Sequence, residues 1–183
     1  MAQIRIHEVN TRIENEVEVS KFLQEEGVLY EKWNISKLPP HLNENYSLTD
    51  ENKAEILAVF SKEIADVSAR RGYKAHDVIS LSNSTPNLDE LLINFQKEHH
   101  HTDDEVRFIV SGHGIFAIEG KDGTFFDVEL EPGDLISVPE NARHYFTSSS
   151  TSISIKTMLT SDPRLDNSIN QLIFQNLGEK VGK

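Results

Sequence analysis

Residues 105–158 read EVRFIVSGHGIFAIEGKDGTFFDVELEPGDLISVPENARHYFTSSSTSISIKTM, a series of short runs rich in β-branched and aromatic residues. Turn-forming clusters separate these runs, at Gly112-His113-Gly114, Lys121-Asp122-Gly123, Pro132-Gly133 and Pro139-Glu140-Asn141. Short strands at this spacing are typical of an all-β sandwich or barrel and not of a parallel sheet with crossover helices. The strands we expect are Val106–Ser111, Ile115–Glu119, Phe125–Leu130, Leu135–Val138, His144–Thr147 and Ser152–Met158.

The segments around this region favour helices. An amphipathic pattern predicts one long helix to Arg71, capped by Ser47, Thr49 or Asp50 and stopped by Gly72. Other expected elements are an alternating run at Gln3–Val9, helices near Val17–Glu26, Pro86–Glu98 and Ile169–Leu177, a loop at Ser36–Tyr46 and a strand from His76. The prediction is a mainly β fold with α: a small antiparallel β-barrel or jelly roll, preceded and flanked by helices. We expect a single domain over residues 1–183, with a helical N-terminal portion at about 10–72, a barrel core at about 76–158 and a tail at 159–183.

Composition narrows the classes of partner and chemistry. The formal net charge of −12 argues against a nucleic-acid surface, which needs clustered Lys and Arg. The chain has no cysteine, so any metal must be held by imidazole and carboxylate groups. No run approaches the ~18 apolar residues of a membrane span, and MAQIRIHEVN lacks the apolar core of a signal peptide. We expect a cytoplasmic protein with neither nucleic acid nor membrane as a partner.

Three histidines and a carboxylate precede and open the first barrel strand. The segment Glu98–Phe108 reads EHHHTDDEVRF. Because side chains alternate along a strand, we expect His99, His101, Glu105 and Arg107 to share one face, with His100 on the other. A run of histidines alone could also be an exposed tract that binds metals adventitiously.

A second segment offers a fourth ligand. Gly133 is followed by Pro139 six positions on and by His144 five positions after that. Together with His99, His101, Glu105 and Gly112, this spacing resembles the two signature motifs of the cupin superfamily. Asn141 stands where the cupin pattern usually has Gly, and Ser148 where it usually has Asn. Asn adopts positive φ at modest cost, and neither change removes a ligand.

Three imidazoles and one carboxylate suit Fe(II), Ni(II), Mn(II) or Zn(II) better than Ca(II) or Cu(I). Four protein ligands leave two positions of an octahedral metal open, so a bidentate substrate can chelate there. Arg107 offers a fixed positive charge to an anionic substrate, although an ion-pair role is also open.

The combined pattern is similar to the acireductone dioxygenase family. Residues 98–108, the run Asp134–Pro139 and His144 carry the resemblance, which extends to Gly27–Trp33, Tyr73–Leu81 and Phe95. It implies that O2 cleaves 1,2-dihydroxy-3-keto-5-methylthiopentene in methionine salvage. The Fe(II) form of the family yields formate and 4-methylthio-2-oxobutanoate, and the Ni(II) form yields methylthiopropanoate, formate and carbon monoxide.

The resemblance also assigns roles to residues. It implies one Fe(II) or Ni(II) per chain held by His99, His101, Glu105 and His144, with Arg107 as the catalytic residue that holds the substrate's charge. Phe95 and Phe146 would line the pocket near the methylthio tail, although either could simply belong to the core. The partners would be the acireductone and O2, and we expect a monomer.

Two positions depart from the family pattern. Arg164-Leu165 stands where the family usually has an aromatic residue, and Lys156 replaces a common Arg on the last strand. These departures concern the pocket wall and not the metal ligands. The alternatives are another cupin dioxygenase or isomerase acting on a different small anion, and a cupin module that binds metal or senses a ligand without turnover.

Overall fold

The structure is a computed structural model of the 183-residue chain. It describes residues 2–44, 48–72, 76–82, 87, 89–90, 93, 96–98, 105–147 and 154–160, and at 43–44, 76–77, 79, 81–82, 105 and 154–160 it describes the backbone only.

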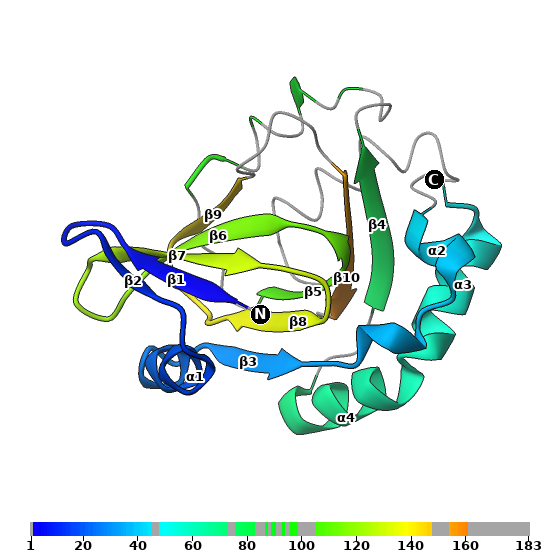
Figure 1. Ribbon diagram of the computed structural model, residues 1–183, viewed down its shortest axis with the longest axis horizontal. Helices are drawn as coiled ribbons and strands as arrows, with labels where there is room; N and C mark the ends of the chain where they lie inside the picture. Colours follow the sequence, from blue (N-terminus) through cyan, green and yellow to red (C-terminus); the bar gives the residue numbers. More distant parts are fainter. Residues whose placement is uncertain are drawn as a thin grey trace.

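Two antiparallel five-stranded sheets form the body of the molecule (Figure 1). The first sheet has the order β2-β1-β7-β6-β9 and the second has the order β3-β8-β5-β10-β4. The strands of the first sheet are β1 (Gln3–Ile6), β2 (Thr11–Ile13), β6 (Gly114–Glu119), β7 (Phe125–Leu130) and β9 (His144–Thr147). Those of the second sheet are β3 (Leu29–Lys32), β4 (His76–Ser82), β5 (Glu105–Gly112), β8 (Asp134–Val138) and β10 (Ser154–Thr160).

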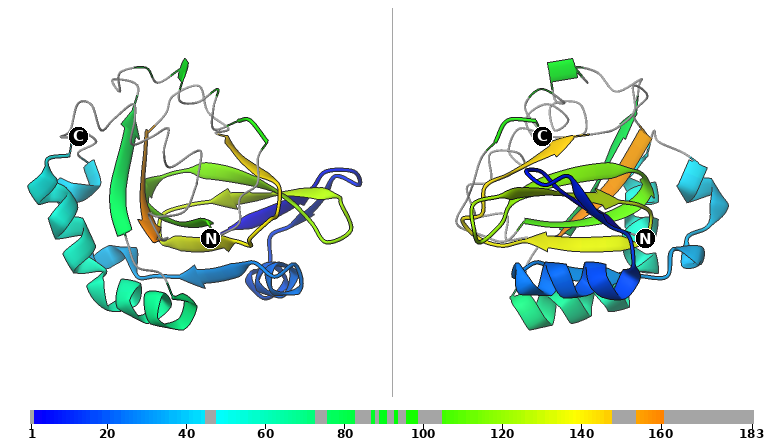
Figure 2. Two further views of the ribbon diagram at one scale, coloured as in Figure 1. Left: turned by 180° about the vertical axis from the view of Figure 1, so that it is seen from behind. Right: turned by 60° about the vertical axis from the view of Figure 1, so that its left-hand side comes forward.

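Helices cover the outside of the second sheet. Figures 1 and 2 show α2, α3 and α4 along the side of the molecule formed by β4, whereas α1 lies beside β3. Their bounds are α1 (Glu16–Glu25), η1 (Ile35–Lys37), α2 (Pro40–Glu44), α3 (Asp50–Val59) and α4 (Ser61–Arg71). The expected fold class, a mainly β fold flanked by helices, is confirmed.

The space between the two sheets, here called the interior, holds one core. Alternate residues of facing strands fill it because side chains point to opposite faces of a strand. From the first sheet come Ile4, Phe116 and Ile118, and from the second come Ile136 and Val138, all at most 1% exposed. The complete inner core also contains Ala2, Val19, Leu23, Val28, Ile109, Phe126, Val128 and Leu130.

A second core lies between the second sheet and the helices. The other residues of β5, Val106, Phe108 and Val110, face this layer. The rings of Trp33, Phe60 and Phe108 pack with centroids 4.6 to 6.1 Å apart. The complete outer core also contains Leu38, Leu42, Ile56, Ile64, Val67, Val78 and Leu135. β5 is therefore buried on both faces.

The N-terminal portion differs from expectation in several places. β2 was not expected, and η1 and α2 fall on the stretch Ser36–Tyr46 that was expected to be a loop. The long helix is two helices, because the backbone at Phe60 leaves the helical region (φ −105°, ψ 17°) where its ring enters the outer core. Thr49 is the N-cap, in a reciprocal capping box with Asn52. β3 was not expected, and it pairs with β8 from Leu29 opposite Ser137 to Lys32 opposite Asp134.

A buried carboxylate fixes β3 against the start of β8. Asp134 is fully buried and accepts hydrogen bonds from the Tyr30 hydroxyl at 2.7 Å, the Lys32 ammonium at 3.2 Å and the Glu131 backbone N–H at 2.8 Å. Burial raises the pKa of Asp134, against the effects of Tyr30 and Lys32. Burial and the neighbouring carboxylate together raise the pKa of Tyr30 above its usual range.

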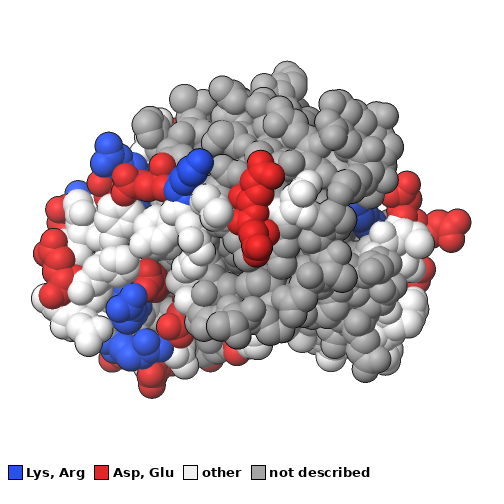
Figure 3. Space-filling model, turned by 90° about the horizontal axis from the view of Figure 1, so that it is seen from above, with Lys and Arg blue, Asp and Glu red and all other residues white. Residues whose placement is uncertain are grey.

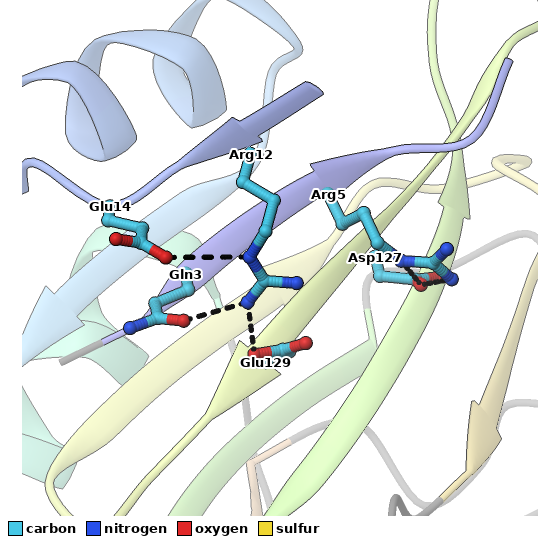
Figure 4. A network of polar contacts seen from close by, with 6 residues as sticks. All are labelled: Gln3, Arg5, Arg12, Glu14, Asp127 and Glu129. Atoms are coloured by element: carbon cyan, nitrogen blue, oxygen red, sulfur yellow. Dashed lines mark hydrogen bonds and ion pairs between the residues drawn. The ribbon is translucent and has the colours of Figure 1, made fainter. Parts of the chain in front are cut away.

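The outer face of the first sheet is polar. The Arg12 guanidinium donates to Gln3 at 2.9 Å and to Glu129 at 3.1 Å, across three neighbouring strands (Figure 4). Arg5 donates its Nε to Asp127 at 3.1 Å on the same face. Polar residues on this face and apolar residues on the other give the alternation expected of a sheet with one face in water.

Acidic and basic side chains are mixed on the described part of the surface seen from above (Figure 3). Among the described residues, no helix is long and apolar enough to cross a membrane.

Candidate metal centre

β5 turns Arg107 toward the interior. Arg107 pairs with Ile136 of β8, an inner-core residue, and it is only 5% exposed. Its neighbours Val106 and Phe108 belong to the outer core, so alternation along the strand leaves Arg107 on the inner face. Its Nη1 donates to the Val106 carbonyl at 3.2 Å. The structure thus places a buried positive charge between the sheets.

Glu105 begins β5 two residues before Arg107 and pairs with Val138. The structure describes only its backbone, and Val138 belongs to the inner core. The alternation that puts Arg107 on the inner face puts position 105 on that face as well.

His144 comes from the first sheet. It opens β9 opposite Ile118, an inner-core residue, and it is fully buried. Its Nδ1 lies 2.8 Å from the Ala142 carbonyl oxygen, which can only accept a hydrogen bond. Nδ1 therefore carries the proton in the neutral ring, and the lone pair is on Nε2, an arrangement common in metal-binding histidines.

The two halves of the site meet at one end of the interior. Val138 ends β8 opposite Glu105, and residues 139–143 then connect it to His144 at the start of β9. Gly133, at the other end of β8, has φ 94°, and a Cβ there would lie 2.8 Å from the Trp33 carbonyl oxygen. This close approach explains why the second motif has glycine at that position.

Phe146 shares the inner face with His144. It pairs with Phe116 of β6, and the two rings meet edge to face with centroids 5.0 Å apart. Phe146 is half-buried and packs against the inner core. Phe116 also lies beside His144, with ring centroids 6.4 Å apart.

The described residues leave part of the predicted site out of view. His99, His101 and Phe95 lie outside them. Among the side chains that are described, no group of three or more His, Asp and Glu could hold a metal ion. Of the four predicted ligands only His144 is described with its side chain, so the ligand set stays a prediction.

Sequence reasoning missed two contributors to the surroundings of His144. Phe116 looked like any apolar strand residue, although its even spacing from Ile118 could have placed it on the inner face. The Ala142 carbonyl carries no signal in the sequence, because a backbone acceptor is the same for every residue type.

Comparisons with known proteins agree with this architecture. The model of the ARD/ARD′ family matches residues 3–167. The acireductone dioxygenases of Bacillus thuringiensis (strain Al Hakam) and Bacillus anthracis are each 99% identical over 147 residues, which is 80% of this chain and 86% of theirs. The acireductone dioxygenase of Bacillus velezensis is 72% identical over 148 residues, covering 80% of this chain and 83% of its own.

A solved structure has the same fold over most of its length. It is the acireductone dioxygenase from Bacillus anthracis with a cadmium ion in its active centre, with a TM-score of 0.87 and 88% identity over 90% of this chain and 95% of that one. The family match spans well over half of the sequence, and it confirms the resemblance and the expected class of enzyme, a dioxygenase. This chain therefore belongs to the ARD/ARD′ family, with the two-sheet fold of the cupins.

Proposed function

We propose that this chain uses O2 to cleave the acireductone 1,2-dihydroxy-3-keto-5-methylthiopentene in methionine salvage. One metal ion, Fe(II) or Ni(II), would be held by His99, His101, Glu105 and His144. The Fe(II) form would give formate and 4-methylthio-2-oxobutanoate, and the Ni(II) form would give methylthiopropanoate, formate and carbon monoxide. The names of the near-identical relatives support the substrate, and the cadmium ion in the related structure supports the need for a metal.

The observation that carries the proposal is that Arg107 and His144, both buried, face the same interior from opposite sheets. A buried cation beside apolar walls suits an anionic ligand, because charge-assisted hydrogen bonds are strong where water is excluded. The donor set also fits a metal. His144 donates Nδ1–H to a carbonyl oxygen, which orients Nε2 as a ligand atom.

Each residue would then have a distinct task. The bound metal would supply Lewis acidity and two open positions for the oxygens of the substrate. Arg107 would bind the negative charge of the substrate and fix its orientation. Phe95 and Phe146 would pack against the methylthio tail, and the inner core against which Phe146 packs would exclude water.

The test is to strip the protein of metal, load it separately with Fe(II) and Ni(II), and add the acireductone in air. We expect oxygen uptake above the uncatalysed background with both metals, and a different set of products with each. Oxygen uptake at background level with both metals would rule the proposal out. Ligand binding without oxygen uptake would instead favour a sensing module.

Replacing His144 tests the ligand set. We expect His144→Ala to weaken Ni(II) binding by more than about 100-fold, because it removes a ligand and not merely an outer contact. His113→Ala is the matched control, since His113 lies exposed between β5 and β6. Stoichiometric metal in purified His144→Ala would contradict the assignment.

The cytoplasmic location and the monomeric state expected from the sequence stay predictions.

A further inference from the structure

Asn141 adopts a left-handed backbone conformation that residues other than glycine seldom take. Its φ is 65°, and in the described residues only Asn10 and Asn87 share a positive φ without being glycine. Asn enters this left-handed region more readily than most residues, and β-branched residues enter it least. Asn141 stands where the cupin pattern usually has glycine, the residue type that takes positive φ most readily.

The turn that contains Asn141 is fixed at both ends. The Ala142 N–H donates to the Pro139 carbonyl at 3.3 Å, and the Glu119 N–H at the end of β6 donates to the Arg143 carbonyl at 2.8 Å. Ala142 itself packs against the inner core. The carbonyl of Ala142 is therefore held in one place, and it is the oxygen that lies 2.8 Å from Nδ1 of His144.

We propose that Asn141 is a positioning residue for His144. Its left-handed backbone directs the Ala142 carbonyl at Nδ1, which fixes both the orientation of the imidazole and the tautomer that has its lone pair on Nε2. An extended backbone at position 141 would redirect the following peptide and remove this acceptor. The consequence for metal binding rests on the proposed function, in which His144 is a ligand, whereas the consequence for the tautomer does not.

Two substitutions at one position separate the backbone from the side chain. Asn141→Gly keeps easy access to positive φ, so we expect wild-type behaviour. Asn141→Val disfavours positive φ strongly, so we expect the turn to rearrange. Asn10→Val is the matched control, because Asn10 has φ 50° in the turn between β1 and β2, outside the 139–143 connection.

The first readout is the tautomer of His144 in the metal-free protein, measured by long-range 1H–15N NMR with histidine labelled in 15N. The signal is assigned by its absence in His144→Gln. We expect the Nδ1–H pattern in wild type, Asn141→Gly and Asn10→Val, and a mixture of tautomers in Asn141→Val. An unchanged tautomer in Asn141→Val would overturn the proposal whether or not the protein binds metal.

The second readout is the affinity for Ni(II) alone. We expect Asn141→Val to bind Ni(II) about 10-fold or more weakly, as measured for lost partners of ligating histidines. Asn10→Val should lose a similar amount of thermal stability and no affinity. Equal losses of affinity in the two valine variants would mean that strain alone acts, which refutes a positioning role.

If wild type itself does not bind Ni(II), the proposed ligand role of His144 fails while the tautomer result still decides the role of Asn141. Should Asn141→Val not fold, Asn141→Ala applies the same test with less strain.

Discussion

Arg107 is a charged side chain with 5% exposure, and charged side chains are seldom buried to this extent without a partner or ligand of opposite charge. Its guanidinium presents several donors in a planar fork that suits paired oxygens. We predict that Arg107→Lys, which keeps the charge and loses the fork, raises the KM for the acireductone about 10-fold or more. Steady-state oxygen uptake measures this, with metal content determined on the same samples.

The metal content separates two roles of Arg107. If Arg107 binds the substrate, Arg107→Lys and Arg107→Met keep one metal ion per chain. Loss of metal in Arg107→Met, with unchanged KM in Arg107→Lys, would show that Arg107 supports the metal ligands and does not bind the substrate.

At the scale of residues, the sequence predicts those site residues whose residue type and spacing indicate a chemical role. His144 and Arg107 are found by motif spacing and strand parity, and the structure puts both on the expected face. The Ala142 carbonyl could not be found in this way, since only the folded turn at Asn141 brings it to Nδ1 of His144. A sequence can therefore predict a polar side chain of the site, but it cannot predict the backbone group that orients that side chain.

At the scale of elements, the barrel strands were easier to predict than the N-terminal ones. Turn glycines bound several of these strands in the sequence. At Gly133 the backbone has φ 94°, and a Cβ would lie 2.8 Å from the Trp33 carbonyl oxygen. β3 also follows a glycine, Gly27 with φ 76°, but its residues Leu29-Tyr-Glu-Lys32 do not alternate clearly between apolar and polar. The helix break at Phe60 was hidden because Phe60 fits the apolar face of a continuous helix.

The hydrogen bond between Tyr30 and Asp134 holds β3 against β8, and no sequence pattern predicts it. We predict that Tyr30→Phe lowers the free energy of unfolding by about 1.5–3 kcal/mol near neutral pH, because it removes a hydroxyl donor from a buried carboxylate. Urea denaturation followed by circular dichroism measures the change.

The raised pKa of Tyr30 adds a pH dependence of known sign. The folded state holds the tyrosine proton more tightly than the unfolded state, whose tyrosine titrates near about 10. This contribution is fully present below pH about 10 and is lost as the pH rises toward the folded pKa. The difference in stability between wild type and Tyr30→Phe should therefore shrink from pH 9 to about 11. A constant difference over this range would contradict the prediction.

At the scale of the whole molecule, the second sheet separates the inner core from the outer core. Its inner face and the first sheet enclose the candidate site, while its outer face packs against the helices. The outer core holds Trp33, Phe60 and Phe108, whereas His144, the predicted ligand whose side chain is described, pairs with the inner-core residue Ile118. Helices α2, α3 and α4 should therefore contribute to stability more than to the site.

A pair of matched substitutions tests whether the inner core affects metal binding more than the outer core does. Phe60 in the outer core and Phe116 in the inner core are both at most 1% exposed, so replacing either with Leu should cost a similar amount, about 1–2 kcal/mol. Phe116 contacts the rings of His144 and Phe146, whereas among the described residues the rings beside Phe60 are those of Trp33 and Phe108. We predict that Phe116→Leu weakens Ni(II) binding about 10-fold, as lost outer contacts of ligands do, while Phe60→Leu leaves it within about 2-fold of wild type. Isothermal titration with Ni(II), beside urea denaturation of both variants, measures the two effects separately. Equal losses of affinity at equal losses of stability would show that the two cores act as one, because metal binding would then follow global stability and not the packing around His144.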